Sequence, residues 1–158
     1  MTTDNPSSPT AAPACFDALL PHHRLMLEEA SGISPEIIRE RGYHSIHGAE
    51  SYAQLRHLGF ANVQSRLAPG LLVPILGRTG APVQYQFRPD IPRPSGRTGK
   101  TIKYETLARR PIRLDFGVGQ ADSLANPAVP VLITEGVKKG DCLRTHGYGV
   151  IVLAGVWN

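Results

Sequence analysis

The sequence predicts a mixed fold, of class α+β to α/β, in which a small helical cap precedes a basic β-hairpin segment and then the first β-α-β unit of a parallel sheet. Three observations predict it. Apolar residues recur at helical spacing up to about residue 60, strand-like patterns begin near residue 70, and two apolar runs near the end flank a helix-like stretch. The 158 residues are enough for one domain with a buried core.

Short helices are expected in residues 16–66, the predicted cap. The second of them has the clearest boundaries, because Ser34 is a good N-cap, Pro35 suits the first helical position and Gly42 suits the end. The predicted helices cover about 22–31, the stretch from Pro35 to Gly42, and 51–60.

Residues 67–116 form the predicted basic β-rich segment. The apolar run 70–76 and the alternating run 83–90 flank a turn-rich connection with two glycines and a proline, a pattern typical of a hairpin. A loop over 91–100 then precedes a further predicted strand over 101–105.

A strand, a helix and a second strand are expected at 129–134, 135–147 and 148–156, after a linker at 117–128. Both strands are continuous apolar runs, which predicts burial on both faces and a parallel pair with a right-handed crossover. Two parallel strands do not form a stable sheet alone, so we expect either that the hairpin strands join them or that the natural protein continues past Asn158. We favour continuation.

Several protein classes are excluded by what the sequence lacks. Residues 1–15 have neither the basic nor the apolar region of a secretion signal, so we expect a disordered leader and a cytoplasmic protein. No apolar run approaches the roughly 20 residues of a membrane span. Cys15 and Cys142 lack partners at disulfide or zinc-site spacing, and no phosphate-loop, dinucleotide or serine-hydrolase motif occurs.

Positive charge is concentrated in residues 78–113, which hold nine Lys or Arg against two acidic residues, in a chain of net charge +4. Such a segment suits a polyanionic partner, although a solvated hairpin without a ligand shows the same charge. Tyr85, Phe87 and Tyr104 lie among the cations, as in stacking platforms for single-stranded nucleic acid. Strand alternation places the first two on one face, where core packing is the favoured role, and Arg88 on the other. The candidate phosphate ligands of this segment are Arg88, Arg93, Lys100 and Lys103.

Glu135 is the sharpest candidate for chemistry, because it lies where a predicted parallel strand ends and a helix begins. A carboxylate there can hold a divalent cation or act as an acid or base, or it can merely complement the helix dipole. Lys138 and Lys139 follow at helical spacing, where they either stabilise the helix through Glu135 or bind phosphate. The six histidines show no metal-site spacing beyond a weak pair, His44 and His47, and are assigned to surface or capping roles.

Three stretches together resemble known replication proteins. Residues 133–158, beginning ITEGVKKGD and ending GVWN, resemble the first half of a Toprim domain, the metal-binding fold of bacterial primases and topoisomerases. With SGISPEIIRERGY at 31–43 and YQFRPDIPRPSGRTGKTIKYE at 85–105, the chain from about residue 20 resembles an uncharacterised Toprim-like family. That family occurs near the amino end of phage, plasmid and integrative-element replication proteins, often before a primase-like or helicase-like region.

The resemblance implies roles for the candidate residues. Glu135 would be the Toprim glutamate, linked to Mg²⁺ or Mn²⁺ or acting as a general acid or base, and Gly136 would let the backbone turn beside it. The basic residues would guide phosphates of DNA or RNA, expected to be single-stranded. Lys139 departs from the pattern, since primases usually carry Asp there, and the DxD element would lie beyond Asn158. Residues 129–158 would thus be a partial Toprim-like domain, inactive alone.

The sequence therefore favours a primase-like nucleotidyltransferase of a mobile element, represented by its amino-terminal portion. The alternatives are a nucleic-acid-binding or regulatory module without catalysis, and a truncated gene remnant.

Overall fold

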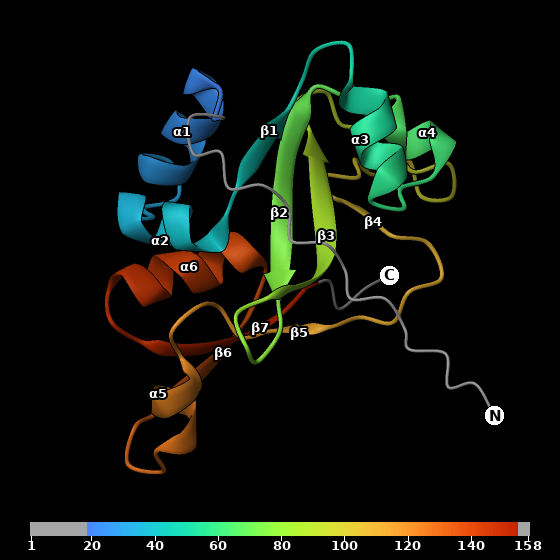
Figure 1. Cartoon of the computed structure of the whole chain (residues 1–158). Helices are drawn as coiled ribbons and strands as arrows, with labels where there is room; N and C mark the ends of the chain where they lie inside the picture. Colours follow the sequence, from blue (N-terminus) through green and yellow to red (C-terminus); the bar gives the residue numbers. More distant parts are fainter. Residues whose placement is uncertain (1–18, 155–158) are drawn as a thin grey trace, which may run out of the picture.

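The structure, a computed structural model, describes residues 19–154, apart from the side chains of residues 121 and 122. It contains two β-sheets with helices packed around and between them (Figure 1). The predicted leader at 1–15, Cys15 and the end of the last predicted strand lie outside the described residues. Within them, no helix is long and apolar enough to cross a membrane.

The first two helices lie beside strand β1 (His44–Ile46) at one edge of the first sheet (Figure 1). Helix α2 (Pro35–Arg41) has the predicted boundaries, because Ser34 Oγ accepts a hydrogen bond from the Ile37 N–H and Gly42 adopts a φ of 74°. Helix α1 (Pro21–Glu28) begins at its proline, although the sequence predicted a start after it.

The first sheet has the antiparallel order β1-β2-β3-β4. Strand β2 (Gly70–Leu76) is buried along its whole length because helices cover both faces of the sheet. Leu71, Val73 and Ile75 pack in a cluster with α1, α2 and α6, whereas Leu72 packs with α3 and Phe87 in the other cluster. The remaining elements of this half are α3 (Ser51–His57), α4 (Asn62–Ser65), β3 (Pro82–Pro89) and β4 (Glu105–Thr106). The strand predicted at 101–105 is reduced to a Pro94–Thr101 bridge and β4.

The second sheet has the order β5-β7-β6 and contains the predicted parallel pair. Strands β6 (Val131–Glu135) and β7 (Gly149–Leu153) are connected by helix α6 (Val137–Thr145), as expected. The hairpin strands do not join this sheet, because β5 (Leu114–Asp115) supplies its third strand, antiparallel to β7. The expected linker also contains a short helix, α5 (Ala121–Ala125).

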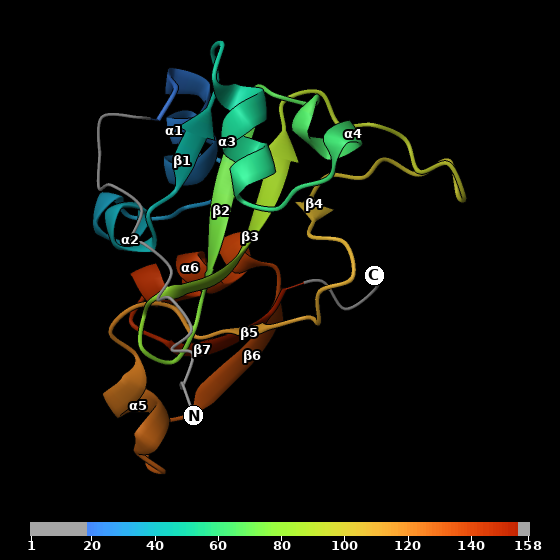
Figure 2. The same cartoon turned by 45° about the vertical axis from the view of Figure 1, so that its right-hand side comes forward.

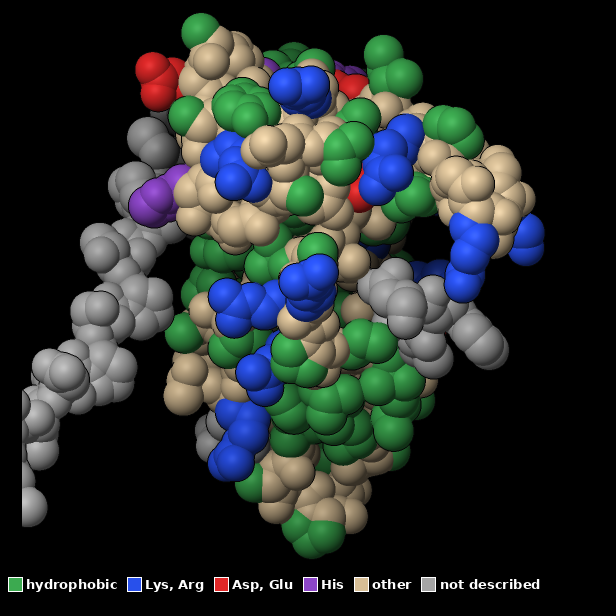
Figure 3. Space-filling model, turned by 90° about the vertical axis from the view of Figure 1, so that its right-hand side faces the viewer, with side chains coloured by type: hydrophobic (Ala, Val, Ile, Leu, Met, Phe, Trp, Pro, Cys, Tyr) green, Lys and Arg blue, Asp and Glu red, His purple; other side chains and the backbone are tan. Residues whose placement is uncertain are grey.

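Strand β6 corrects one prediction. It lies at the edge of its sheet, so its apolar side chains are not covered on both faces, and Ile133 is 69% exposed. Val131 and Leu132 are exposed as well. Figure 2 shows β6 at the outer side of the sheet, and an apolar area occupies the lower half of the face in Figure 3. Continuous apolarity therefore predicted burial correctly for β7 only, because a strand's place in the sheet is not encoded in its own residues.

Helix α6 lies between the two sheets (Figure 1) and contacts β7 closely at Gly140. A Cβ atom at this position would lie 2.3 Å from Val152 Cγ2, so only glycine allows this approach. The helix thereby reaches the cluster that it shares with β2 and β7, and the turn before it is held against both sheets.

A buried ionic network, which the sequence did not reveal, ties these elements together. The fully buried Arg41 guanidinium donates to Asp141 from Nε at 2.9 Å and to Asp115 from Nη2 at 2.9 Å, with a further Nη1 bond to Asp115. Tyr43 Oη donates to Asp141 at 2.8 Å, and the Leu76 N–H donates to Asp115 at 2.7 Å. Helix α2, strand β5, helix α6 and the end of β2 are therefore joined at one point.

Charge balance in this network decides its ionisation. Burial alone would lower the pKa of Arg41, but the hydrogen bonds and charges of Asp141 and Asp115 outweigh it and raise the pKa. Burial, reinforced by the charge of Asp141, raises the pKa of Tyr43, so its hydroxyl remains a donor. Arg144 extends the network from α6, donating to Asp141 at 3.3 Å and to the Val118 carbonyl at 2.5 Å.

Candidate nucleic-acid interface

Glu135 lies at the carboxyl end of β6, at the position predicted for it. It is the last residue of the strand, is exposed, and is followed by Gly136 with a φ of 86° at the start of α6. A Cβ atom on Gly136 would contact nothing within 4 Å, so the left-handed φ rather than crowding favours glycine. The turn thus presents the carboxylate to solvent at a sheet edge where α/β proteins bind ligands.

A pocket of about 370 Å³ opens beside this turn. Its walls come from the β6–α6 turn on one side and from the first sheet on the other, so residues far apart in sequence meet there. Glu135, Lys138 and Lys139 line it together with Tyr104 of the basic segment. The lining residues not yet named are Val73, Gln86, Thr106, Gly136 and Val137.

Arg88 and Tyr104 connect the basic segment to this pocket. The Arg88 guanidinium carbon lies 5.5 Å from the centre of the Tyr104 ring, within the range of a cation–π contact. Burial raises the pKa of Tyr104, against the opposite influence of the Arg88 charge and hydrogen bond. The ring therefore stays a neutral support for a partly buried cation.

Lys138, on helix α6, lines the same pocket as Tyr104. Its Nζ donates to Ser31 Oγ at 3.0 Å, and that hydroxyl donates to the Met26 carbonyl at 2.7 Å. Burial lowers the pKa of Lys138, and the positive charges of Arg88 and Lys103 lower it further. Arg88 and Lys103 thus each lie close enough to Lys138 to repel its charge, and an anion bound beside Lys138 would relieve this repulsion. These three residues are called the cation cluster.

Arg93, the other arginine predicted as a phosphate ligand, is held differently. Its Nε and Nη2 donate to the two carboxylate oxygens of buried Glu105 at 2.7 and 2.9 Å, and Gln64 Nε2 donates to the same carboxylate at 3.0 Å. The hydrogen bond to Glu105 raises the pKa of Arg93. Its charge is already balanced, so Arg93 fixes the segment between β3 and β4.

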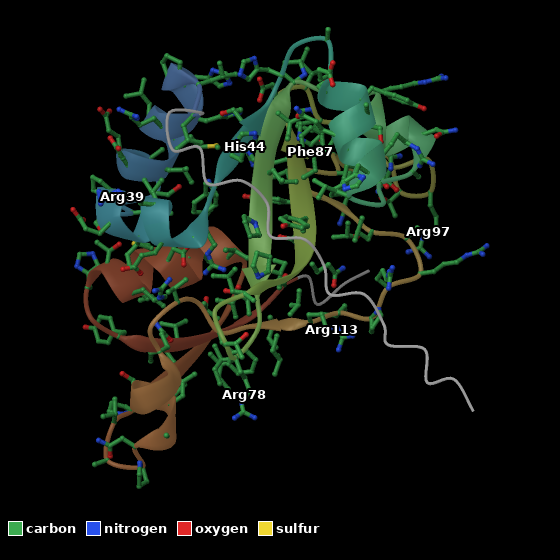
Figure 4. The ribbon with its side chains drawn as sticks, in the orientation of Figure 1. Arg39, His44, Arg78, Phe87, Arg97 and Arg113 are labelled. Atoms are coloured by element: carbon green, nitrogen blue, oxygen red, sulfur yellow. The ribbon has the colours of Figure 1, made fainter. Side chains whose placement is uncertain are left out.

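Lys100 and Lys139 are both exposed, Lys100 on the loop between β3 and β4 and Lys139 on α6. Figure 4 shows Arg97 of this loop projecting away from the sheets, and Arg39 on the opposite side of the molecule. The loop is closed by the Pro94–Thr101 bridge and by the Ser95 N–H, which donates to the Lys100 carbonyl at 2.8 Å.

A second pocket, of about 400 Å³, shares Gln86 and Thr106 with the first. It is lined by three arginines that the sequence placed in the basic segment without singling them out: Arg109, Arg110 and Arg113. Their concentration in a short run was the available signal. Figure 3 shows Lys and Arg side chains spread over the middle of one face, with few acidic side chains in view.

The two aromatic residues of β3 differ in burial. Phe87 is fully buried and packs edge-on against Phe60, so core packing is confirmed for it (Figure 4). Tyr85 is half-buried against the same cluster, and this burial raises its pKa. Tyr104 is therefore the aromatic side chain of the segment that lies beside the cation cluster.

The surface role expected for the histidines is wrong for His23. Its ring is buried, with Nδ1 2.7 Å from Ser45 Oγ and Nε2 2.7 Å from Asp90 Oδ1. Ser45 lies 22 positions after His23 in the sequence, and Asp90 lies 67 positions after it. No local spacing pattern indicates contacts over such separations.

The donor set around Glu135 does not by itself suit Mg²⁺ or Mn²⁺. Among the side chains described, Glu135 is the one carboxylate lining either pocket, and Lys138 and Lys139 line the same space. Such ions take several oxygen ligands. Residues 19–154 therefore offer one carboxylate to a divalent ion at this pocket, and its other ligands would have to come from elsewhere.

Comparison with known proteins agrees with this architecture. A family model described as a domain of unknown function, DUF3854, matches residues 121–158. No curated protein matches the chain. The zinc-binding and RNA polymerase domains of the Aquifex aeolicus primase superpose with a TM-score of 0.56 at 14% identity, over 86% of this chain and 37% of that one. A DnaG primase catalytic domain bound to ssDNA gives 0.50 at 18%, over 87% and 48%.

The chain has the fold of part of a primase catalytic core. The predicted mixed fold class is confirmed, and the resemblance to primases holds at the level of fold. The chain spans less than half the length of either of these two structures.

Proposed function

We propose that this chain is the amino-terminal portion of a primase-like replication protein of a phage, plasmid or other mobile element, acting in the cytoplasm on single-stranded DNA or RNA. One observation carries the proposal. The pocket at the carboxyl end of β6 combines an exposed carboxylate, Glu135, with a lysine of a cation cluster whose arginine stacks on the tyrosine of the same pocket. The fold shared with primase cores, one of them bound to ssDNA, supports it.

In this proposal the cation cluster binds backbone phosphates. Arg88 offers a planar donor supported by Tyr104, whereas Lys103 and Lys138 act as point charges. Lys100 and Lys139 are further exposed cations that would add to the positive surface, and Arg93 keeps β4 in place through Glu105. A helicase-like region or protein is the partner that the family resemblance suggests.

Glu135 would act as the acid or base of the site. An exposed carboxylate at a strand end can accept a proton from an attacking hydroxyl held on the neighbouring cations. A Toprim-type site would also use Mg²⁺ or Mn²⁺ to stabilise charge on the transferred phosphoryl group. We propose that the additional carboxylates for this ion come from outside residues 19–154.

The proposal is tested by the salt dependence of oligonucleotide binding. A labelled single-stranded oligonucleotide is titrated with wild type, Arg88→Ala/Lys103→Ala, and the control Arg24→Ala/Arg39→Ala, which removes the same charge from exposed positions on α1 and α2. Losing two phosphate contacts makes the negative slope of log K against log salt shallower by about 1.4, while the control keeps the wild-type slope. No binding at low salt, or equal loss in both variants, would overturn the proposal.

A non-catalytic binding module is the second candidate, favoured by the single carboxylate of the pocket and by the cationic Lys139 four residues after it. Primer synthesis by the natural full-length protein separates the two. Loss of synthesis in Glu135→Gln with unchanged oligonucleotide binding supports catalysis. Absence of synthesis in wild type, with the predicted binding retained, supports the module.

A further inference from the structure

Two histidines and an aspartate converge at the edge of the first sheet, where α1 meets the end of β3. His22 Nε2 lies 3.0 Å from Asp90 Oδ2, and His23 Nε2 lies 2.7 Å from Asp90 Oδ1. One ligand atom from each of the three lies within 4.8 Å of the other two. No other group of three or more His, Cys, Asp or Glu side chains within the described part of the chain is arranged in this way.

The approach of both rings to one carboxylate is unusual for neighbouring residues. Successive positions of a helix point in different directions, yet the His22 and His23 ring centres are only 4.1 Å apart, at an angle of 48°. The side chain of His22 is 57% exposed, but its ring turns toward Asp90. Both rings therefore turn toward Asp90, an arrangement that helix geometry alone does not produce.

The buried ring is fixed by groups behind it. His23 Nδ1 lies 2.7 Å from Ser45 Oγ on β1, and the Leu20 N–H donates to the same hydroxyl at 2.8 Å. In metal sites, the histidine nitrogen that does not bind metal is held by such a partner, which orients the other nitrogen. Asp90 is anchored in turn by its N–H, which donates to the Pro69 carbonyl at 3.0 Å.

We propose that His22, His23 and Asp90 form a Zn²⁺ site with three protein ligands and one position open to solvent. Zinc binds imidazole nitrogen and carboxylate oxygen at about 2.0–2.2 Å, which in a tetrahedral site places the ligand atoms about 3.3 Å apart. The two nitrogen–oxygen distances, 3.0 and 2.7 Å, are shorter than that spacing by about 0.3 and 0.6 Å. The partly exposed side chains of Asp90 and His22 would therefore move apart to admit the ion. Two imidazoles and one carboxylate suit zinc better than Mg²⁺ or Ca²⁺.

The site is separate from the pocket at Glu135 and does not rest on the proposed function. Asp90 follows Arg88 by two residues, so an ion held here would fix the end of the strand that carries the cluster's arginine. The alternative is a hydrogen-bonded triad without a metal ion, in which the Asp90 carboxylate accepts a hydrogen bond from each histidine ring. The two explanations share one static geometry and differ in their response to metal.

Metal titration distinguishes them. Metal-free protein is titrated with Co²⁺, followed by its visible absorption, and then with competing Zn²⁺; the melting temperature is measured with and without Zn²⁺. The variants are His22→Ala, whose exposed position spares the fold, and Asp90→Asn, which keeps the shape of the side chain. His57→Ala, which removes an exposed histidine of α3, is the matched control.

We expect wild type and His57→Ala to bind one equivalent of Co²⁺, to release it to Zn²⁺, and to melt at a higher temperature with Zn²⁺. His22→Ala and Asp90→Asn should each lose at least tenfold in affinity, together with the shift in melting temperature. Failure of wild type to bind Co²⁺ or Zn²⁺ at micromolar concentration would overturn the zinc site in favour of the hydrogen-bonded triad. Equal binding by His22→Ala would overturn it by showing that the ion does not use His22. Oligonucleotide binding is measured separately, and its outcome tests the proposed function without deciding the zinc site.

Discussion

The Arg41 network and the cation cluster hold positive charges in opposite ways. Arg41 is buried and bonded to two aspartates, and Arg144 shares one of them. In the cluster, Arg88 lies over an aromatic ring and Lys138 bonds to a serine hydroxyl, and within residues 19–154 no ion pair joins either to a carboxylate. Cations that are neutralised inside the protein hold the fold, whereas cations left without a counter-charge are available to an external anion.

Substitution of Arg41, at the centre of the buried network, should have the largest effect. Arg41→Met leaves Asp115 buried without its cation and Asp141 with only the longer ion pair to Arg144. Breaking a buried pair in this way costs about 3–5 kcal/mol of unfolding free energy. Urea unfolding of this variant, with Arg39→Met as the exposed control on the same helix, measures the loss. A cost below about 1 kcal/mol would show that the network does not hold the two sheets together.

Arg93→Ala tests whether Arg93 stabilises the fold, as Arg41 does, or binds phosphate, as proposed for Arg88. It removes two charge-assisted hydrogen bonds from buried Glu105, so we expect a loss of about 2 kcal/mol in stability. Because Glu105 already balances its charge, the salt dependence of oligonucleotide binding should stay near the wild-type slope. A slope reduced as much as in Arg88→Ala would instead place Arg93 among the phosphate ligands.

The sequence predicted the parts of this comparison that depend on local pattern. Ser34, Pro35 and Gly42 define α2 because capping involves residues close in sequence. Two apolar runs around a helix predicted the parallel pair, and the turn between them placed Glu135. The basic segment was found by counting charge, but a count treats Arg88 and Arg93 alike, and only the structure shows that one is paired with Glu105.

Long-range pairing explains what the sequence did not predict. Arg41 meets Asp115 and Asp141, which lie 74 and 100 residues away, and His23 meets Asp90 across 67 residues. No periodicity links such positions, so a buried arginine in α2 has the same local pattern as an exposed one. The exposure of Ile133 was missed for a related reason, since an edge strand and a central strand have the same apolar sequence.

The single variant Arg88→Ala tests how much this one residue of the cation cluster contributes to oligonucleotide binding. Loss of one phosphate contact should make the negative slope of log K against log salt shallower by about 0.7 for a single-stranded oligonucleotide, with little change in stability. Fluorescence anisotropy over a salt series measures the slope, and Arg24→Ala provides the single-charge control. An unchanged slope in Arg88→Ala would remove this arginine from the interface.

Lys138→Met should produce the smallest change in stability. The direction of that change shows whether the charge of Lys138 opposes folding. The pKa of Lys138 is lowered from 10.5 by burial and by Arg88 and Lys103, so its charged form disfavours the folded state. At neutral pH we therefore expect the variant to be at least as stable as wild type, despite losing the bond to Ser31, while its binding slope falls by about 0.7.

The sign of the pH dependence follows from the same shift. Between the lowered pKa of the folded state and 10.5, the unfolded chain binds the Lys138 proton and the folded chain does not, so wild type gains stability relative to the variant as pH rises toward 10.5. Unfolding free energies of both proteins, measured in parallel from neutral pH upward, give this difference with the other titrations cancelled. A constant difference, or a variant clearly less stable at neutral pH, would mean that Lys138 serves the fold, as Arg41 does.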